Sequence, residues 1–258
     1  MTPIEKTGYL VHNINKKNNQ ALRFVLEMLD NCKSPYISLS FGKDSIPMAD
    51  LILTNYPDTP VIYCYCGEFD EWPDTERVKR KFLDIHQNCN FHQVNGPSII
   101  EFYKRLGYVY IQDLETNPEA AKIQREYGAS LEKAVVSKAR ELGCDGAFIG
   151  MRKNESINRA RLFAMRSEVY FTESRQMWTC CPIAQWSARD VWAYIVQKNL
   201  PWNELYDKHP EGREKARNGA MFGTRSDTFT GRLSMMRRMY PEWWNRFLQQ
   251  FPEIAERT

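Results

Sequence analysis

The sequence lacks the features that mark secreted, membrane-spanning and strongly nucleic-acid-binding proteins. Residues 1–19 carry charges and asparagines without an apolar core segment, so we expect no signal peptide. No uninterrupted apolar run approaches the roughly 20 residues that a membrane-spanning helix needs. The net charge is only +3, from 35 basic and 32 acidic residues, which is too small to demand a nucleic-acid partner. These absences predict a cytoplasmic protein without membrane contact.

Several common motifs are also absent. No G-x-G-x-x-G fingerprint occurs, and Lys43 is followed by Asp44 where a Walker A loop requires Ser or Thr. The seven cysteines are odd in number, unevenly spaced and free of C-x-x-C pairs, which indicates reduced thiols rather than a disulfide framework. The four histidines, which are His12, His86, His92 and His209, show no ligand spacing, so we assign them no role.

What the sequence does contain is an alternation of apolar segments between strand and helix periods. This alternation predicts an α/β fold, in which a doubly wound, mainly parallel sheet is flanked by helices. The expected strands are 36–40, 61–65, 91–94, 146–150 and 169–172, and the expected helices are 20–31, 45–55, 73–87, 97–106, 130–142 and 187–198. Residues 107–129 are expected to be partly irregular, and Ser187 with Asp190 predicts a capping box. We expect a nucleotide-binding domain over residues 1–200 and a helical, aromatic and basic C-terminal extension over 201–258 packed on it.

The most informative segment is the turn between the first expected strand and the helix 45–55. It reads Ser40-Phe41-Gly42-Lys43-Asp44-Ser45. A helix that begins after a tight turn offers unpaired backbone N–H groups and a positive dipole end, which together attract phosphate. Gly42 permits a close approach of the backbone, Ser40 and Ser45 offer hydroxyl groups, and Lys43 can neutralise the outer phosphates. The turn is therefore predicted to bind a polyphosphate, whereas a strand-turn-helix without a ligand is the plain alternative.

A second polar segment, residues 150–161, follows the expected strand 146–150. In an open α/β sheet the ligand crevice lies at the carboxyl ends of the strands. Arg152 and Arg159 are placed there, and a planar guanidinium suits phosphate or sulfate oxygens. As exposed side chains, both arginines are expected to contribute little to folding. A solvated charged loop is the alternative for this segment if it is taken alone.

These segments resemble those of a known family. The turn 40–45 resembles the S-G-G-K-D-S loop of the PP-loop ATP pyrophosphatases, the adenine nucleotide alpha-hydrolase superfamily, with Phe41 in place of the first glycine. The whole set, over roughly residues 20–207, looks like the phosphoadenosine phosphosulfate (PAPS) reductase-like family, and the segment 203–207 with the tail resembles its IbrA-like branch of phage and bacterial proteins. The motifs that carry the resemblance are Ser40 to Ser45, Gly67 with Pro73-Asp74-Thr75, Gly150-Met151-Arg152 with Glu155-Ser156 and Arg159, and Cys181 to Trp186 with Asp190-Val191-Trp192.

The resemblance implies an adenine nucleotide at the carboxyl edge of the sheet and cleavage at its α-phosphate. Two departures count against reduction of PAPS. Family members without a cluster carry a nucleophilic cysteine in a C-terminal Glu-Cys-Gly-Ile/Leu-His element, whereas the last cysteine here is Cys181. Those reductases also generally lack the lysine found here as Lys43, which is typical of relatives that hold a β,γ-pyrophosphate. We therefore expect ATP, with transfer of its adenylyl group to an acceptor and release of pyrophosphate.

The expected catalytic residues are Lys43, Asp44 and Arg152, and Asp44 is also the candidate ligand of Mg²⁺. Cys66 stands where relatives have threonine in an Asp-Thr-Gly turn, so it is expected to line the adenosine pocket. The candidate nucleotide-binding residues are Ser38, Ser40, Phe41, Gly42, Lys43, Asp44, Ser45, Cys66, Gly67, Gly150, Arg152, Ser156 and Arg159.

Two further groups of residues leave alternatives open. Cys64, Cys66, Cys180 and Cys181 might meet at one sheet edge around zinc or an iron-sulfur cluster, but their spacing is wrong for either and no cluster is expected. In the basic and aromatic tail, Arg225 and Arg232 are candidates for a lid or a nucleic-acid contact, whereas Trp243, Trp244, Phe247 and Phe251 indicate a packing segment. The alternative functions are a sulfonucleotide (PAPS or APS) reductase and a nucleotide-sensing regulator with a ParB-like partner; a homo-oligomer stays open.

Overall fold

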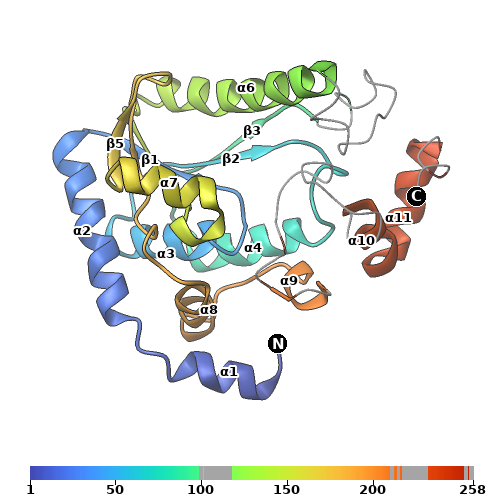
Figure 1. The fold of residues 1–258 in the computed structure, drawn as a ribbon, viewed down its shortest axis with the longest axis horizontal. Coiled ribbons are helices and arrows are strands. Elements are labelled where there is room, and N and C mark those ends of the chain that lie inside the picture. Colours follow the sequence, from blue (N-terminus) through green and yellow to red (C-terminus); the bar gives the residue numbers. More distant parts are fainter. Residues whose placement is uncertain are drawn as a thin grey trace.

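A six-stranded sheet forms the centre of the computed structural model, which describes residues 1–98, 101, 118–209, 212–213, 216, 232–252 and 255 (Figure 1). The strands lie in the order β3-β2-β1-β4-β6-β5, and only β5 runs antiparallel to its neighbour. Their bounds are β1 Pro35–Leu39, β2 Val61–Tyr65, β3 Phe91–Asn95, β4 Gly146–Ile149, β5 Val169–Thr172 and β6 Met177–Cys180. The chain builds outward from β1 to β3 and then returns to place β4 on the other side of β1. The carboxyl ends of β1 and β4 therefore form the switch point at which such sheets bind ligands.

Helices cover both faces of the sheet, as the alternating pattern predicts. Helix α6 lies along one face, and α3 and α4 lie across the other (Figure 1). The helices are α1 Pro3–Leu10, α2 Asn15–Asn31, α3 Ser45–Asn55, α4 Thr75–Ile85, α6 Pro118–Glu141, α7 Ile157–Met165, α8 Ala188–Gln197, α9 Leu205–Lys208, α10 Arg232–Met239 and α11 Pro241–Gln250, with a short 3-10 turn, η2, at Lys153–Glu155. Among the residues described, no helix has the length and apolarity needed to cross a bilayer.

The two faces of the sheet bury separate apolar clusters. In β1, Ile37 and Leu39 belong to the larger cluster with α2, α3 and α8, whereas Tyr36 belongs to the smaller cluster beneath α6. Strands buried on both faces read as nearly continuous apolar runs, which is the pattern that predicts a parallel sheet. The expected α/β, doubly wound architecture is therefore confirmed.

Several elements match their predicted bounds. Helix α3 spans Ser45–Asn55, β2 spans Val61–Tyr65 and β5 spans Val169–Thr172, each as expected. The predicted capping box is present at the start of α8. There the Asp190 N–H donates to Ser187 Oγ at 3.2 Å, and the Ser187 N–H donates to Asp190 Oδ2 at 2.7 Å. These features were predictable because a cap, a turn and a local apolar period are all short-range signals.

Other predictions were wrong. Helix α6 begins at Pro118, twelve residues before the expected start at 130, so 118–129 are helical rather than irregular. Helix α7 and strand β6 were not predicted. None of the α7 residues is buried, and β6 has only four residues, so neither gives a clear apolar period. The expected helix 97–106 falls almost entirely outside the described residues.

The C-terminal helices are anchored by aromatic side chains. Trp243, Trp244, Phe247 and Phe251 are all buried, as the packing interpretation of the tail predicts. Phe69, in the connection after β2, lies 5.1 Å from the Trp243 ring and 5.6 Å from the Phe247 ring, measured between centroids. The tail thus packs on the segment that leads from β2 to α4, while the domain division at residue 200 remains a prediction.

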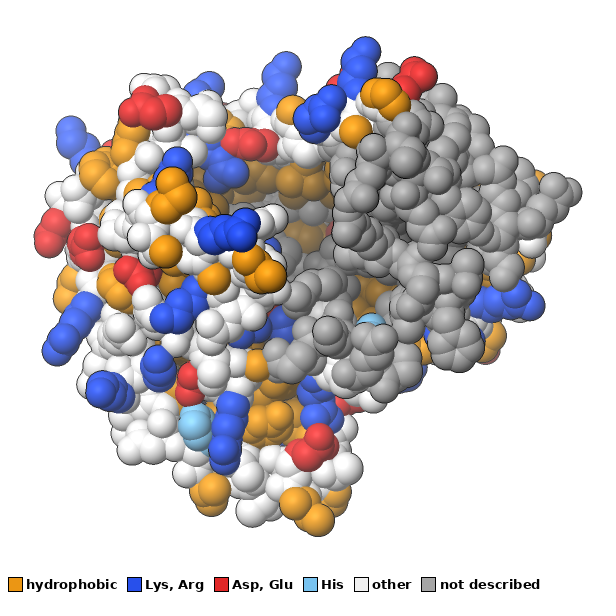
Figure 2. Space-filling model, in the orientation of Figure 1, with side chains coloured by type: hydrophobic (Ala, Val, Ile, Leu, Met, Phe, Trp, Pro, Cys, Tyr) orange, Lys and Arg blue, Asp and Glu red, His pale blue; other side chains and the backbone are white. Residues whose placement is uncertain are grey.

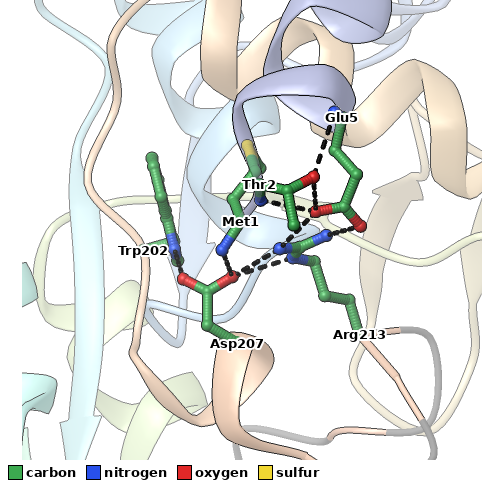
Figure 3. A network of polar contacts seen from close by, with 6 residues as sticks. All are labelled: Met1, Thr2, Glu5, Trp202, Asp207 and Arg213. Atoms are coloured by element: carbon green, nitrogen blue, oxygen red, sulfur yellow. Dashed lines mark hydrogen bonds and ion pairs between the residues drawn. The ribbon is translucent and has the colours of Figure 1, made fainter.

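A polar network ties the start of α1 to the end of α9 (Figure 3). Asp207 accepts hydrogen bonds from the Met1 amine at 2.9 Å, from Trp202 Nε1 at 2.8 Å and from Arg213 Nη2 at 2.7 Å. Arg213 also donates to Glu5 Oε1 at 2.8 Å. This network fixes α9, in which the Tyr206 hydroxyl accepts a hydrogen bond from the Lys43 N–H at 2.9 Å.

The network predicts a stability contribution that is lost in acid. Hydrogen bonds from Arg213 and from the Thr2 backbone lower the pKa of Glu5 from 4.5 to about 2. A carboxyl with a depressed folded-state pKa stabilises the fold above pH 4.5 and loses that contribution as the pH falls towards 2. Because Glu5 is exposed, we expect Arg213→Gln to cost only about 0.5 kcal/mol at pH 7, or roughly 1–2 °C in Tm. Thermal melts from pH 7 to 2 should show the two curves converging below pH 4.5; a constant difference would contradict the linkage.

Candidate active site

The loop between β1 and α3 is held in shape by its own hydrogen bonds. Ser45 Oγ accepts a hydrogen bond from the Ser40 N–H at 3.3 Å and donates one to the Gly42 carbonyl at 3.2 Å. The Ile46 N–H also donates to the Gly42 carbonyl, at 3.1 Å, and this bond starts the helix. The Ile46 N–H is thus paired and Pro47 has no N–H, so a ligand at the start of α3 would meet the Ser45 N–H and the positive end of the helix dipole. Ser40 to Ser45 thus has the strand-turn-helix geometry that the sequence predicts.

The side chain of Phe41 anchors this loop in the hydrophobic core. Its φ is +53°, in the left-handed region that favours glycine, and its side chain is 0 % exposed. The ring lies 4.9 Å from that of Tyr63, 6.0 Å from that of Phe82 and 6.3 Å from that of Phe91. The expectation that Phe41 binds nucleotide is therefore wrong for its side chain, because burial in the core leaves only its backbone for a ligand.

Three charged side chains meet at this loop, and we call them the ion trio. They are Lys43 and Asp44 of the loop and Arg152, which follows β4. Lys43 Nζ lies 2.7 Å from Asp44 Oδ2, and Arg152 Nε lies 2.6 Å from Asp44 Oδ1. The side chains of Lys43 and Arg152 are each 2 % exposed. Two cations around one carboxylate leave a net charge of +1 beside the positive end of α3. The structure thus joins the three expected catalytic residues, although Asp44 and Arg152 lie 108 residues apart in the sequence.

This arrangement corrects the expected exposure of Arg152. A buried guanidinium paired with a buried carboxylate is part of the folding energetics, since removing one partner leaves the other desolvated and unpaired. The sequence could not show this burial, because the pair joins residues that follow β1 and β4, two strands that are far apart in the sequence and neighbours only in the folded sheet. Arg159 differs: its side chain is 39 % exposed and pairs with Glu155.

Gly150 explains how the two segments meet. A methyl group on Gly150 would stand 2.8 Å from Ser45 Cα and 2.9 Å from Ser45 N. Such distances are shorter than van der Waals contact, so only glycine allows the end of β4 to pass this close to the loop. The predicted neighbourhood of the two segments is therefore present.

Ser156 and Arg159 support the turn after β4. Ser156 caps α7, because its Oγ accepts a hydrogen bond from the Arg159 N–H at 3.2 Å. Glu155, the partner of Arg159, also accepts a hydrogen bond from the Arg152 N–H at 3.0 Å. In the structure these residues brace the segment that carries Arg152, and direct contact with a nucleotide remains a prediction for both.

A cavity of about 180 Å³, the β1–β2 cavity, opens beside the loop. Figure 2 shows this face hollowed below α6, with hydrophobic side chains on the floor of the hollow. The volume is below the roughly 300–1,000 Å³ of typical ligand pockets, which suits one moiety of a nucleotide. The cavity is lined by Ser38, Leu39, Ser40, Ile62, Tyr63, Cys64, Cys66, Asp70, Glu71, Thr75, Tyr127, Leu131 and Val135.

Three predicted residues, Ser38, Ser40 and Cys66, line this cavity, and sequence reasoning missed three polar ones. Tyr127 was missed because it lies in the stretch expected to be irregular, although α6 carries it over the sheet. Asp70 and Glu71 follow Gly67, which begins a tight turn. Gly67 has a φ of +127°, and its carbonyl accepts a hydrogen bond from the Asp70 N–H at 3.2 Å. Burial raises the pKa of Glu71 to about 7, against the opposing effect of a hydrogen bond from the Tyr63 hydroxyl. A Gly-x-x-Asp-Glu pattern after a strand could have indicated this turn.

The four cysteines considered for a cluster do not converge. Cys64 lies in β2 and Cys66 just after it, whereas Cys180 ends β6 and Cys181 follows it, and β1 and β4 lie between these two strands. Three strand spacings separate the two pairs by roughly 14 Å. Within the described ranges, no three His, Cys, Asp or Glu side chains group as metal ligands would.

The ion trio also bears on the expected role of Asp44 as a magnesium ligand. Each carboxylate oxygen of Asp44 is within 2.7 Å of a cationic nitrogen. A site for Mg²⁺ needs oxygen donors that are free to face the ion. The donor set does not fit a protein-held Mg²⁺, so any magnesium would have to arrive with the phosphates of a nucleotide.

The two arginines considered for a lid, and two of the histidines to which we assigned no role, are not part of the described site. Arg225 falls outside the described residues, and Arg232 begins α10 without a described side chain. His12 Nε2 lies 2.7 Å from Asp190 Oδ1, and His86 Nε2 lies 3.0 Å from Asp50 Oδ1. Both histidines thus join helices to neighbouring segments, and neither contacts the loop.

Comparison with known proteins gives consistent results. Residues 34–241 match the model of the phosphoadenosine phosphosulfate reductase domain family. An uncharacterized protein of Methanocaldococcus jannaschii is 26% identical over 95% of this chain, and the chain spans only 47% of that relative. The phosphoadenosine 5'-phosphosulfate reductase of Proteus mirabilis is 24% identical, with 80% of each chain covered. The crystal structure of a phosphoadenylyl-sulfate reductase from Candida auris, a phosphate complex, aligns with a TM-score of 0.57 and 19% identity, covering 82% of this chain and 96% of its own.

Proposed function

Because the chain belongs to the phosphoadenosine phosphosulfate reductase domain family, within the PP-loop adenine nucleotide alpha-hydrolase superfamily, we propose that it binds an adenine nucleotide at the switch point of its sheet. The adenosine lies in the β1–β2 cavity, and the phosphates lie over the loop 40–45. The observation that carries this proposal is the net positive ion trio fused to the N-terminus of α3. A fixed positive dipole end and a surplus cation together favour a polyphosphate.

The nucleotide that fits best is ATP, cleaved at its α-phosphate. An oxygen of the acceptor attacks the α-phosphorus, a new P–O bond forms, and the bond to pyrophosphate breaks. The Lys43 side chain and the Ser45 N–H at the start of α3 hold the departing pyrophosphate, and Arg152 fixes Asp44 so that Lys43 stays in place. Such a site works through positioning and charge stabilisation, and it needs no protein nucleophile. The acceptor, whether sulfate, a nucleic-acid base or a protein, is not fixed by the described residues.

Reduction of a sulfonucleotide is the second candidate, because the Proteus mirabilis relative is named as such a reductase. Cys181 is a poor substitute for the C-terminal thiol that such reductases use. It is buried, and burial raises its pKa to about 12, although nearby Arg159 opposes that shift. A thiol held protonated in an apolar setting is a weak nucleophile. The third candidate is a regulator that binds the nucleotide at this same site without turning it over, alone or with a ParB-like partner.

Calorimetric titration tests the ligand. We expect Mg-ATP to bind more tightly than PAPS, and Lys43→Ala to weaken ATP binding by about 1.5–3 kcal/mol, which is roughly 10- to 150-fold, because one charge-assisted contact is lost. Lys33→Ala is the matched control, since Lys33 is exposed and precedes β1 at the opposite end of the strand. PAPS binding as tight as ATP binding, with no effect of Lys43→Ala, would overturn the assignment.

Turnover needs a separate measurement. ATP labelled at the α-phosphate, incubated with sulfate, nucleic acid or candidate proteins, should yield labelled acceptor together with pyrophosphate. Binding without release of pyrophosphate would favour the regulator, and thioredoxin-dependent release of sulfite from PAPS or APS would favour the reductase.

A further inference from the structure

Two cysteine side chains converge in the wall of the β1–β2 cavity. Cys64 lies near the end of β2, Cys66 follows that strand, and both line the cavity. A methyl group placed on Gly96 would stand 2.5 Å from Cys64 Sγ and 3.1 Å from Cys66 Sγ. Both sulfur atoms therefore lie against Gly96, which follows β3 and has no side chain.

The two thiols are chemically unequal. The interaction between the two thiol groups lowers the pKa of Cys64, although burial opposes this shift. The same interaction, together with burial, raises the pKa of Cys66. The Tyr127 hydroxyl donates a hydrogen bond to Cys66 Sγ at 3.7 Å, and this bond only partly opposes the rise in the pKa of Cys66. Cys64 is thus the better nucleophile, and Cys66 is a protonated neighbour placed to react with whatever Cys64 becomes.

The other cysteines lack this arrangement. Burial raises the pKa of Cys32 to about 12 and also raises the pKa values of Cys89 and Cys144. Cys180 is fully buried, and its Sγ donates to the Phe24 carbonyl at 3.4 Å. Oxidants react with thiolates that they can reach, so reaction should concentrate at the cavity pair.

We propose that Cys64 and Cys66 are a redox-active dithiol that a hydroperoxide converts to a disulfide across the wall of the β1–β2 cavity. The Cys64 thiolate attacks the distal oxygen of the hydroperoxide, whose O–O bond breaks, and the alkoxide or hydroxide that leaves takes up a proton. The Cys64 sulfenic acid is then attacked by the Cys66 sulfur, and water leaves with the Cys66 proton. The two sulfur atoms give up two electrons, and the peroxide accepts them.

Disulfide formation should alter nucleotide binding, a consequence that rests on the proposed function. A disulfide brings the two sulfur atoms to about 2.05 Å and so reshapes the wall against which the adenosine would pack. The peroxide must also enter the cavity that the nucleotide would fill. Nucleotide binding and disulfide formation should therefore oppose each other, and by linkage the factor by which the disulfide weakens nucleotide binding equals the factor by which bound nucleotide disfavours the disulfide at redox equilibrium.

The first experiment uses the reduced full chain and one equivalent of hydrogen peroxide, followed by alkylation and peptide mass mapping. We expect a mass lower by about 2 Da and a cross-linked Cys64–Cys66 peptide, because two thiol hydrogens are removed. Cys66→Ser should leave a Cys64 sulfenic acid that dimedone traps, and Cys89→Ser should behave as the unaltered protein does. Oxidation that maps to other cysteines, or a Cys64–Cys66 pair that stays alkylatable, would overturn the proposal.

Gly96→Ala is the sharpest variant, because it keeps every thiol and inserts a methyl group where the two sulfur atoms converge. We expect it to slow disulfide formation about tenfold or more, since the pair must move apart to admit the methyl group. Circular dichroism identifies the folded fraction that is compared. Unchanged disulfide formation in folded Gly96→Ala would contradict the geometry.

The second experiment separates this proposal from the proposed function. Saturating Mg-ATP should slow the oxidation, and the oxidised chain should bind Mg-ATP about tenfold more weakly than the reduced chain. If the reduced chain binds Mg-ATP but no disulfide forms, the dithiol proposal fails alone. If the disulfide forms and no adenine nucleotide binds to the reduced chain, the nucleotide assignment fails alone.

Discussion

Asp44→Asn is expected to lower the free energy of unfolding by about 3–5 kcal/mol, because it leaves two buried cations without their shared counter-charge. Lys43 and Arg152 are each 2 % exposed and both contact the Asp44 carboxylate. The amide supplies no negative charge, and it replaces one of the two accepting oxygens with an N–H group that faces a cationic donor. Urea unfolding followed by circular dichroism measures the loss. Asp58→Asn is the control, since Asp58 lies exposed between α3 and β2 and should change stability by about 0.5 kcal/mol or less.

The same variant carries a second expected result that a packing defect would not give. Inorganic phosphate or sulfate should raise the Tm of Asp44→Asn more than that of the unaltered protein, since a bound anion would replace the missing charge beside α3. Stability equal to that of the unaltered protein would show that the ion trio is not a buried network. A loss of stability that anions do not relieve would separate the trio from phosphate binding.

Phe41→Ala should cost a similar amount, about 3–5 kcal/mol, because a fully buried ring is lost from a cluster of aromatic side chains. Phe41→Gly should cost about 1 kcal/mol less than Phe41→Ala, although glycine is the smaller residue. The reason is the φ of +53°, which alanine adopts only under strain and glycine adopts freely.

Parallel urea titrations of the two variants test this order. Phe171→Ala serves as a control, because Phe171 lies at the sheet edge in β5 and is 39% exposed, so its loss should cost much less. If alanine proves more stable than glycine at position 41, the backbone strain assigned to the loop is absent.

The candidate site was predictable where it depends on neighbouring residues in the chain. A strand, a Ser-rich turn and a helix follow one another between residues 36 and 55, so the loop could be located from the sequence alone. The approach of Gly150 to Ser45 followed from the rule that parallel strands end at one edge. The burial of Arg152 could not be predicted in this way. The sequence shows that the side chain is cationic, but it does not show how deeply the segment after β4 lies in the folded protein.

The remaining errors have a similar origin. Phe41 looks like a loop residue that could face a ligand, and only the packing of Tyr63, Phe82 and Phe91 shows that its ring points inward. Tyr127 and strand β6 were missed because tertiary contacts, rather than a clear local period, define them. In each case the sequence shows the chemical type of the side chain, whereas the packing of segments that are far apart in the sequence determines which residues it contacts.

The burial of Phe41 has a consequence for hydrogen exchange. Loops that bind ligands commonly open on their own, at a free-energy cost well below that of global unfolding. Here the loop cannot lift away without withdrawing an aromatic ring from the core, so the amide hydrogens of Ser40 and Ile46, which are hydrogen-bonded within the loop, should exchange with deuterium as slowly as those of β1. A phosphate ligand would then meet donors that are already ordered, and little conformational entropy would be lost when it binds.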